Sequence, residues 1–221
     1  MATDLLYPAR LEIAYPERLD RLTTLLRPIW AIPILVILVL VSGGGGGTVS
    51  LNEQGERIRS TGATVAGSIA VATALMLVFR QRYPRWWFDF QYALARFSFR
   101  VGAYLGLLRD EYPSTEDEQA VRLELDYPNA ATLNRWLPLV KWLLAIPHYI
   151  VLVVLVVFAL VAIVIAWFAI LITGRYPRGL FDFVVGVGRW ALRVEAYAFL
   201  LITDRYPPFS MRGAAHGSMS R

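Results

Sequence analysis

The sequence predicts an all-α integral membrane protein built from two copies of one unit. Hydrophobic residues make up 57% of the 221 residues and charged residues only 18%, whereas an average soluble domain has about 45–50% and about 25%. Short motifs also recur in the same order in both halves of the chain. Apolar composition and internal repetition together predict a tandem duplication of a membrane-embedded unit.

The repeated motifs define the two copies. They pair residues 10–16 with 122–128, 31–33 with 145–147, 82–85 with 175–178, 88–90 with 181–183, and 110–113 with 204–207. We expect a first membrane repeat at residues 9–113, a second at residues 121–209, and a flexible tail at residues 210–221.

Each copy opens with a short alternating segment that ends in Tyr-Pro. Residues 11–13 are Leu-Glu-Ile and residues 123–125 are Leu-Glu-Leu. Alternation before a proline favours an edge strand or an extended arm. Two interpretations follow: the arms pair with each other on the cytoplasmic side, or each is an ordinary extended lead-in.

Apolar segments of membrane length lie in both copies. Residues 143–172 contain no charged residue, which exceeds the roughly 20 residues needed to cross a bilayer. Residues 63–79 and 29–41 are two further segments. We expect an apolar helical hairpin in each copy and four spans in all. The second hairpin has no polar loop, so it makes two short tilted crossings or dips in without fully crossing.

A glycine-rich loop at residues 42–62 distinguishes the first copy. Its five-glycine run, Gly43 to Gly47, is typical of a flexible linker. No Gly-Lys-Ser/Thr follows it, which excludes a phosphate-binding loop of that kind.

Basic and aromatic residues flank the apolar segments and set the expected orientation. Trp30 and Trp142, with Arg27 and Lys141 nearby, are typical interfacial anchors. Arginines precede the first and follow the last segment of each copy. By the positive-inside rule, we expect a multi-pass protein of the bacterial cytoplasmic membrane with both termini in the cytoplasm.

Each copy ends in an amphipathic helix, expected at residues 86–108 and 180–201. Its charged stripe, with a tyrosine at Tyr104 or Tyr197, spans about 80° of an otherwise apolar helix. This pattern favours an interfacial helix whose arginines bind lipid phosphates. The alternative is a third crossing whose charges face a protein partner, which would make the copies inverted, as in many transporters. The candidate lipid-headgroup or partner-binding residues are Arg82, Arg85, Asp89, Arg96, Arg100, Arg175, Arg178, Asp182, Arg189 and Arg193.

Catalytic chemistry has few candidate residues. The chain has no cysteine, and its only histidines are His148 and His216. His148 is expected to be a hydrogen-bonded packing residue and not a ligand, and Gly186 and Gly188 to be small-residue packing positions. No cluster has metal-ligand spacing, so we expect no metal, no cofactor and no enzymatic activity.

The second copy carries a family resemblance. Residues 142–149 (Trp-Leu-Leu-Ala-Ile-Pro-His-Tyr), 174–183, Arg189-Trp190 and 204–209 resemble a bacterial membrane family catalogued as domain of unknown function 4389. The resemblance extends over nearly the whole chain, although the first copy departs from it at Ile34 and in its glycine loop. It implies a membrane protein and no particular activity.

The expected function is a non-enzymatic membrane-embedded scaffold or accessory subunit, including a membrane-shaping one. Its expected partners are anionic lipid headgroups and further copies of itself or a larger membrane complex, and no nucleic acid. The alternative is a small transporter or channel. The apolar segments contain no Asp, Glu, Lys or Arg in their interiors, whereas an ion-coupled carrier usually needs one there.

Overall fold

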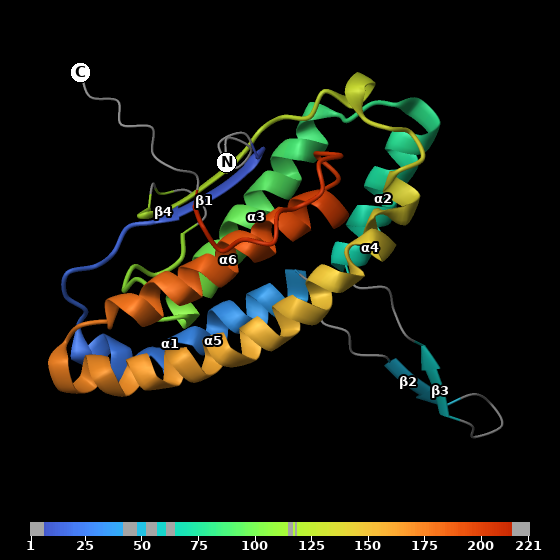
Figure 1. Cartoon of the computed structure of the whole chain (residues 1–221). Coiled ribbons are helices and arrows are strands. Elements are labelled where there is room, and N and C mark those ends of the chain that lie inside the picture. Colours follow the sequence, from blue (N-terminus) through green and yellow to red (C-terminus); the bar gives the residue numbers. More distant parts are fainter. Residues whose placement is uncertain are drawn as a thin grey trace, which may run out of the picture.

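The computed structural model describes residues 7–41, 48–51, 57–60, 65–114, 117 and 119–213. This part of the chain is mostly helical (Figure 1), as the sequence predicts. Its helices are α1 (Arg21–Val41), α2 (Val65–Arg80), α3 (Arg85–Leu105), α4 (Pro138–Leu144), α5 (Ile146–Thr173), α6 (Arg178–Ala198) and the 3₁₀ turn η2 (Ala130–Thr132). Its strands are β1 (Ala9–Ile13), β2 (Thr48–Leu51), β3 (Arg57–Ser60) and β4 (Val121–Leu125).

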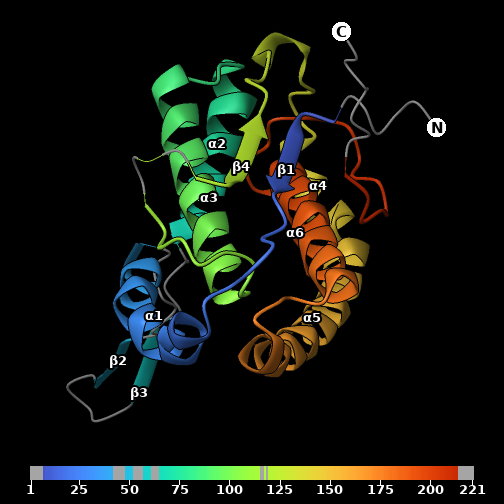
Figure 2. The ribbon, with the colours of Figure 1, turned by 90° about the vertical axis from the view of Figure 1, so that its left-hand side faces the viewer.

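The elements other than β2 and β3 are arranged in layers (Figure 2). The two-stranded ribbon of β1 and β4 lies over α3 and α6, and these helices lie over α1 and α5. α2 packs against α4 beside this stack. The main core lies between the ribbon and the middle helices and includes Leu11, Leu123, Phe88 and Phe181.

The ribbon joins the two arms in antiparallel register. Leu11 lies opposite Leu123, with Arg10 opposite Glu124 on one side of this pair and Arg122 opposite Glu12 on the other. Both leucines are buried, so the alternation of the arms turns one ribbon face toward the helices. The pairing of the two arms is confirmed, whereas their cytoplasmic location stays a prediction. Leu11 and Leu123 hold the same position in their respective motifs.

The expected hairpin in the second copy is wrong. α5 is one continuous helix of 28 residues, about 42 Å long at 1.5 Å per residue. Residues 147–173 contain no glycine and no proline after Pro147, so nothing in the sequence breaks the helix before Gly174. That residue takes the left-handed conformation (φ 71°) and donates its N–H to the Ile170 carbonyl, which is a common way to end a helix.

The four expected spans are not found. Within the described residues, α5 is the one helix long and apolar enough to cross a membrane, and residues Gly67–Arg80 of α2 form a shorter apolar helix. The expected glycine linker, Gly43 to Gly47, lies outside the described residues.

Gly186 permits the chain after α6 to lie against that helix. A Cβ atom at Gly186 would stand 2.9 Å from the Met211 Cβ, and one at Gly188 would stand 3.4 Å from a Leu11 methyl group. Residues 210–213, the start of the expected flexible tail, therefore pack on α6, and residues 214–221 lie outside the described part.

Candidate functional site

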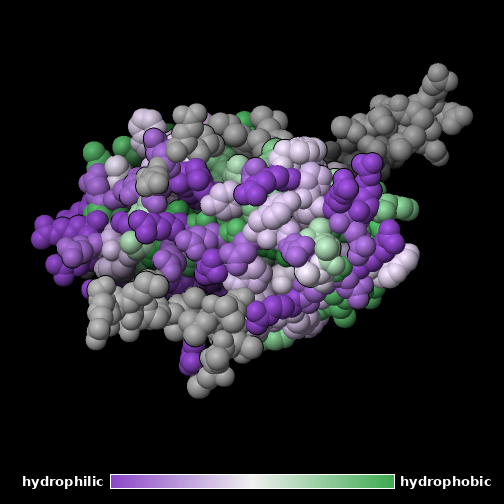
Figure 3. All heavy atoms as spheres, turned by 90° about the horizontal axis from the view of Figure 1, so that it is seen from above, coloured by the Kyte–Doolittle hydropathy of each residue, from purple (hydrophilic) through white to green (hydrophobic). Residues whose placement is uncertain are grey.

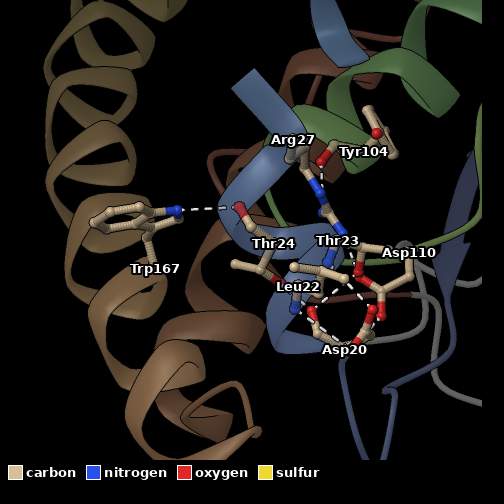
Figure 4. A network of polar contacts seen from close by, with 8 residues as sticks. All are labelled: Asp20, Leu22, Thr23, Thr24, Arg27, Tyr104, Asp110 and Trp167. Carbon is tan, nitrogen blue, oxygen red and sulfur yellow. Dashed lines mark hydrogen bonds and ion pairs between the residues drawn. The ribbon is translucent and has the colours of Figure 1, made fainter. Parts of the chain in front are cut away.

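Arg27 of α1 is buried in a polar cluster (Figure 4), with only 2% of its surface exposed. Its guanidinium forms an ion pair with Asp110 and donates a hydrogen bond of 2.9 Å to the Tyr104 carbonyl. The guanidinium carbon lies 4.6 Å from the centroid of the Tyr104 ring. The other carboxylate oxygen of Asp110 accepts the backbone N–H of Asp20 at 2.8 Å. The Arg27 charge is therefore compensated inside the fold.

The same cluster fixes the start of α1. Asp20 accepts the Thr23 N–H at 3.1 Å, which satisfies a donor that the first helical turn leaves open, and these hydrogen bonds lower the pKa of Asp20. Trp167 of α5 donates to the Thr24 carbonyl at 3.2 Å. Through these contacts, the last motif of the first copy positions α1, and α1 is joined to α5 (Figure 4).

Lys141 of α4 occupies an equivalent cluster in the second copy. Its ammonium is fully buried and lies 2.7 Å from Asp204, donates to the Thr203 carbonyl at 2.9 Å, and lies 5.3 Å from the Tyr197 ring centroid. The second oxygen of Asp204 accepts the Asn134 N–H at 2.6 Å. Burial lowers the pKa of Lys141, and the hydrogen bond with Asp204 opposes this effect.

A second pair of equivalent contacts crosses between the copies. Tyr15, which ends the first arm, donates to the Tyr176 carbonyl, and Tyr127, which ends the second arm, donates to the Tyr83 carbonyl. Arg178 lies over the Tyr15 ring at 4.9 Å and Arg85 over the Tyr127 ring at 5.1 Å. The first arm is thereby attached to the turn before α6, and the second arm to the turn before α3.

The charged stripes of α3 and α6 contain four arginines, which lie near the ribbon: Arg96, Arg100, Arg189 and Arg193. Arg189 donates to the Leu11 carbonyl at 3.0 Å, Arg193 to the Arg212 carbonyl, and Arg100 to the Ser114 carbonyl at 2.5 Å. Arg189 and Arg193 line a pocket of about 540 Å³ beside β1, and Arg96 and Arg100 line one of about 520 Å³ beside β4. In the structure, all four arginines therefore line pockets that also border the ribbon, and Arg189 bonds to it directly.

The other predicted site residues lie beyond the ends of α2 and α5 or near the starts of α3 and α6. Arg82 and Arg85 border a pocket of about 740 Å³ beyond the end of α2, and Arg175 borders one of about 500 Å³ beyond the end of α5. The carboxylates of Asp89 and Asp182 belong to exposed residues in the first turns of α3 and α6. The structure thus separates the ten predicted residues into a ribbon group and a group at the helix ends.

His148 is a packing residue within this framework. It is fully buried, its Nδ1 accepts the Trp190 indole N–H at 3.1 Å, and its ring stacks on Phe209 at 4.0 Å. Burial lowers the pKa of His148, so its neutral form is favoured. No group of three or more potential metal-ligating side chains is found in the described part of the chain.

The sequence did not identify the two buried ion pairs. Arg27 and Lys141 each lie just before an Ala-Ile-Pro motif and beside a tryptophan, a setting that interfacial anchors share. Their partners are far away in sequence, because Asp110 follows Arg27 at a separation of 83 positions. Repetition is the one sequence feature that points to these ion pairs, because each half of the chain has one basic residue at this position and one Asp-x-Tyr-Pro motif at its end.

Comparison with known proteins covers part of the second half of the chain. Residues 136–211 match the family model described as Domain of unknown function (DUF4389). The match supports this family. Neither the curated proteins nor the solved structures give a significant match. The DUF4389 segment contains α4, α5 and α6 and all members of the Lys141 ion-pair cluster except Asn134.

Proposed function

We propose that this protein is a non-enzymatic scaffold or accessory subunit embedded in the cytoplasmic leaflet of a bacterial membrane. In this proposal the helices α1, α4 and α5 lie in lipid and the ribbon faces the cytoplasm. The observation that carries the proposal is the separation of an exposed apolar surface from the hydrophilic ribbon side of the molecule.

The apolar surface extends over the outer helices. Only 17% of the most apolar 18-residue window of α5 is buried, and Val153, Val157 and Ile172 are among its exposed residues. Ile29 of α1 and Leu143 of α4 are exposed in the same way. The opposite side, seen from above the ribbon, is mainly hydrophilic (Figure 3). A contiguous apolar surface of this kind indicates a lipid or protein contact.

The residues beside this apolar surface indicate that it contacts lipid. Trp30, Trp136 and Trp142 are all more than half exposed, and tryptophan is enriched where a membrane meets water. Arg82 and Arg175, beyond the ends of α2 and α5, are also exposed and lie close in sequence to the exposed Phe79 and Ile172. Arginines beside an apolar surface are suited to the phosphates of anionic lipids.

The packing of α5 favours insertion from one side over a crossing. α5 and α6 contact each other at both ends, through Tyr149 and Phe199 at one end and through the shared core of Ile170 and Phe181 at the other. α6 in turn binds the ribbon through Arg189. A crossing by α5 would place this arginine and the outer edges of the ribbon at bilayer depth, where unpaired backbone groups are very costly.

Vesicle flotation tests the lipid contact. We expect binding to vesicles that contain phosphatidylglycerol, and a loss of about fivefold for each of Arg82→Gln and Arg175→Gln, because an arginine near an anionic surface contributes about 1 kcal/mol. Arg122→Gln on the ribbon is the matched control and should bind as the wild type does. If all three variants lose vesicle binding equally, the attraction of the protein to anionic lipid is not confined to the proposed face.

Flux measurements separate the scaffold from the carrier. No Asp, Glu, Lys or Arg lies within α5, so reconstituted protein is expected to give no coupled proton or sodium flux. Instead, native-lipid extracts should contain a self-associated species or a stable complex. A saturable flux that Asp182→Asn abolishes would contradict the scaffold proposal.

A further inference from the structure

The two outer edges of the ribbon carry pockets built to the same plan. The pocket at β1 is lined by two stripe arginines of α6, Arg189 and Arg193. The pocket at β4 is lined by the corresponding arginines of α3, Arg96 and Arg100. Arg189 donates to the carbonyl of Leu11, the central residue of β1. The same combination of strand edge and helix arginines therefore occurs at both edges.

We propose that these pockets bind a soluble small anion with two or more closely spaced phosphate or carboxylate groups, and that the β1 pocket binds it more tightly. This proposal goes beyond membrane binding and does not depend on it. Both pockets border the ribbon, which lies on the far side of α3 and α6 from α1 and α5 (Figure 2).

The charge of the β1 pocket supports an anionic ligand of high charge. Six arginines and one glutamate line it: Arg10, Arg109, Arg122, Arg189, Arg193 and Arg212, with Glu12. Arg10 is paired with Glu124 and Asp126. For Arg109, Arg189 and Arg212, no carboxylate of the described residues lies within ion-pair distance. A singly charged ion would compensate only one of the charges of Arg109, Arg189 and Arg212.

The form of the pocket supports a small ligand. Its volume of about 540 Å³ lies in the usual range of about 300–1,000 Å³ for small-molecule sites. Residues 212–213 form one wall, because the Arg212 carbonyl accepts from Arg193 and a Cβ atom at Gly213 would stand 3.1 Å from the Arg189 guanidinium. Arginine side chains bind phosphate and carboxylate in a two-pronged geometry, so several converging arginines favour adjacent anionic groups. The buried Nε of Arg109 has no hydrogen-bond partner in the described part of the chain.

The β4 pocket is the weaker site by the same reasoning. It has Arg96, Arg100 and Arg122 with Glu124, in a similar volume of about 520 Å³. Fewer arginines around one glutamate leave less positive charge for the anion.

Calorimetric titration with tripolyphosphate at constant ionic strength tests the proposal on the full chain in mild detergent. We expect saturable binding, weakened roughly tenfold by Arg189→Gln and by Arg212→Gln, since each removes a charge-assisted hydrogen-bond donor. Arg82→Gln removes one arginine charge outside both pockets and should bind as the wild type does. Arg96→Gln should affect only the weaker of two binding events.

The controls distinguish the pocket from general attraction and from misfolding. Thermal unfolding is recorded for each variant. If Arg189→Gln fails to fold, the test depends on Arg212→Gln, which changes an exposed side chain. Equal weakening by Arg82→Gln would overturn the proposal, as would wild-type binding by Arg212→Gln.

Two further experiments identify the source of the anion. Tripolyphosphate should bind equally well to protein already bound to phosphatidylglycerol vesicles, because the pockets face away from the lipid. Loss of binding on vesicles would overturn the soluble source and indicate lipid headgroups. Tighter binding of a poly-glutamate peptide than of tripolyphosphate would overturn the small ligand and indicate strand addition by a protein partner.

Discussion

At the scale of single residues, the fold encloses two basic side chains that each need an acidic partner. Arg27 is 2% exposed and Lys141 is fully buried, and Asp110 and Asp204 lie beside them with about a quarter of each side chain exposed. Because a buried charge without its partner is strongly unfavourable, these aspartates hold the last motif of each copy against α1 or α4. The ion pairs are therefore structural restraints on the layer that we assign to lipid.

Removing either carboxylate should destabilise the protein. Asp110→Asn and Asp204→Asn are each expected to lower the free energy of unfolding by about 3 kcal/mol, since the buried cation stays behind. Asp126→Asn is the matched control: its carboxylate is 53% exposed and pairs with Arg10, so the expected loss is below about 1 kcal/mol. Denaturant unfolding in detergent measures all three, and equal losses would show that burial of the ion pairs is not the cause.

Glu195 should make stability depend on pH. Burial raises its pKa to about 7 from the ordinary value of 4.5, so the folded chain keeps this proton over a range in which the unfolded chain has lost it. Stability is therefore expected to fall as the pH rises from about 4.5 to about 7. Glu195→Gln should remove this component, and unfolding curves at pH 5 and pH 8 for both proteins measure it. An identical pH dependence in the variant would contradict the assignment.

At the scale of elements, what the sequence predicts depends on whether the signal is local. The alternating arms predict strands, and the charged stripe predicts α3 and α6 with nearly their observed bounds. The apolar run of residues 143–172 predicts a helix but does not determine whether the chain turns within it. The observed continuity of α5 and the contacts of Arg27 and Lys141 depend on distant segments, which spacing alone does not reveal.

A proline in the middle of α5 tests its continuity. Val157 is 56% exposed, so Val157→Pro removes little packing but interrupts the helical hydrogen bonds, at a cost of about 3 kcal/mol. Val157→Ala is the control and should be close to the wild type. Wild-type stability of the proline variant in lipid would instead support a turn at this position, as in the hairpin that the sequence predicts for residues 143–172.

At the scale of the whole molecule, equivalent contacts occur in pairs. Leu11 faces Leu123 at the centre of the ribbon, the two buried ion pairs use corresponding motifs, and the two arm tyrosines bind carbonyl groups of the opposite copy. Each pair joins residues of motifs that recur in both halves of the sequence. In our account, it places the apolar helices on one side and the twin arginine pockets on the other.

The depth of α5 in the membrane tests the central claim most directly. Spin labels on single cysteines at Ile150, Val157, Val164 and Ile172 of this cysteine-free chain report depth through their relative accessibility to oxygen and to a polar nickel reagent. A label at Glu12 on the ribbon is the aqueous reference. If α5 lies in one leaflet, all four of its labelled positions should have similar, shallow depths. A depth profile that peaks at Val157 and falls toward both ends would show a crossing helix, and water-like accessibility at all four would show that this surface does not contact lipid.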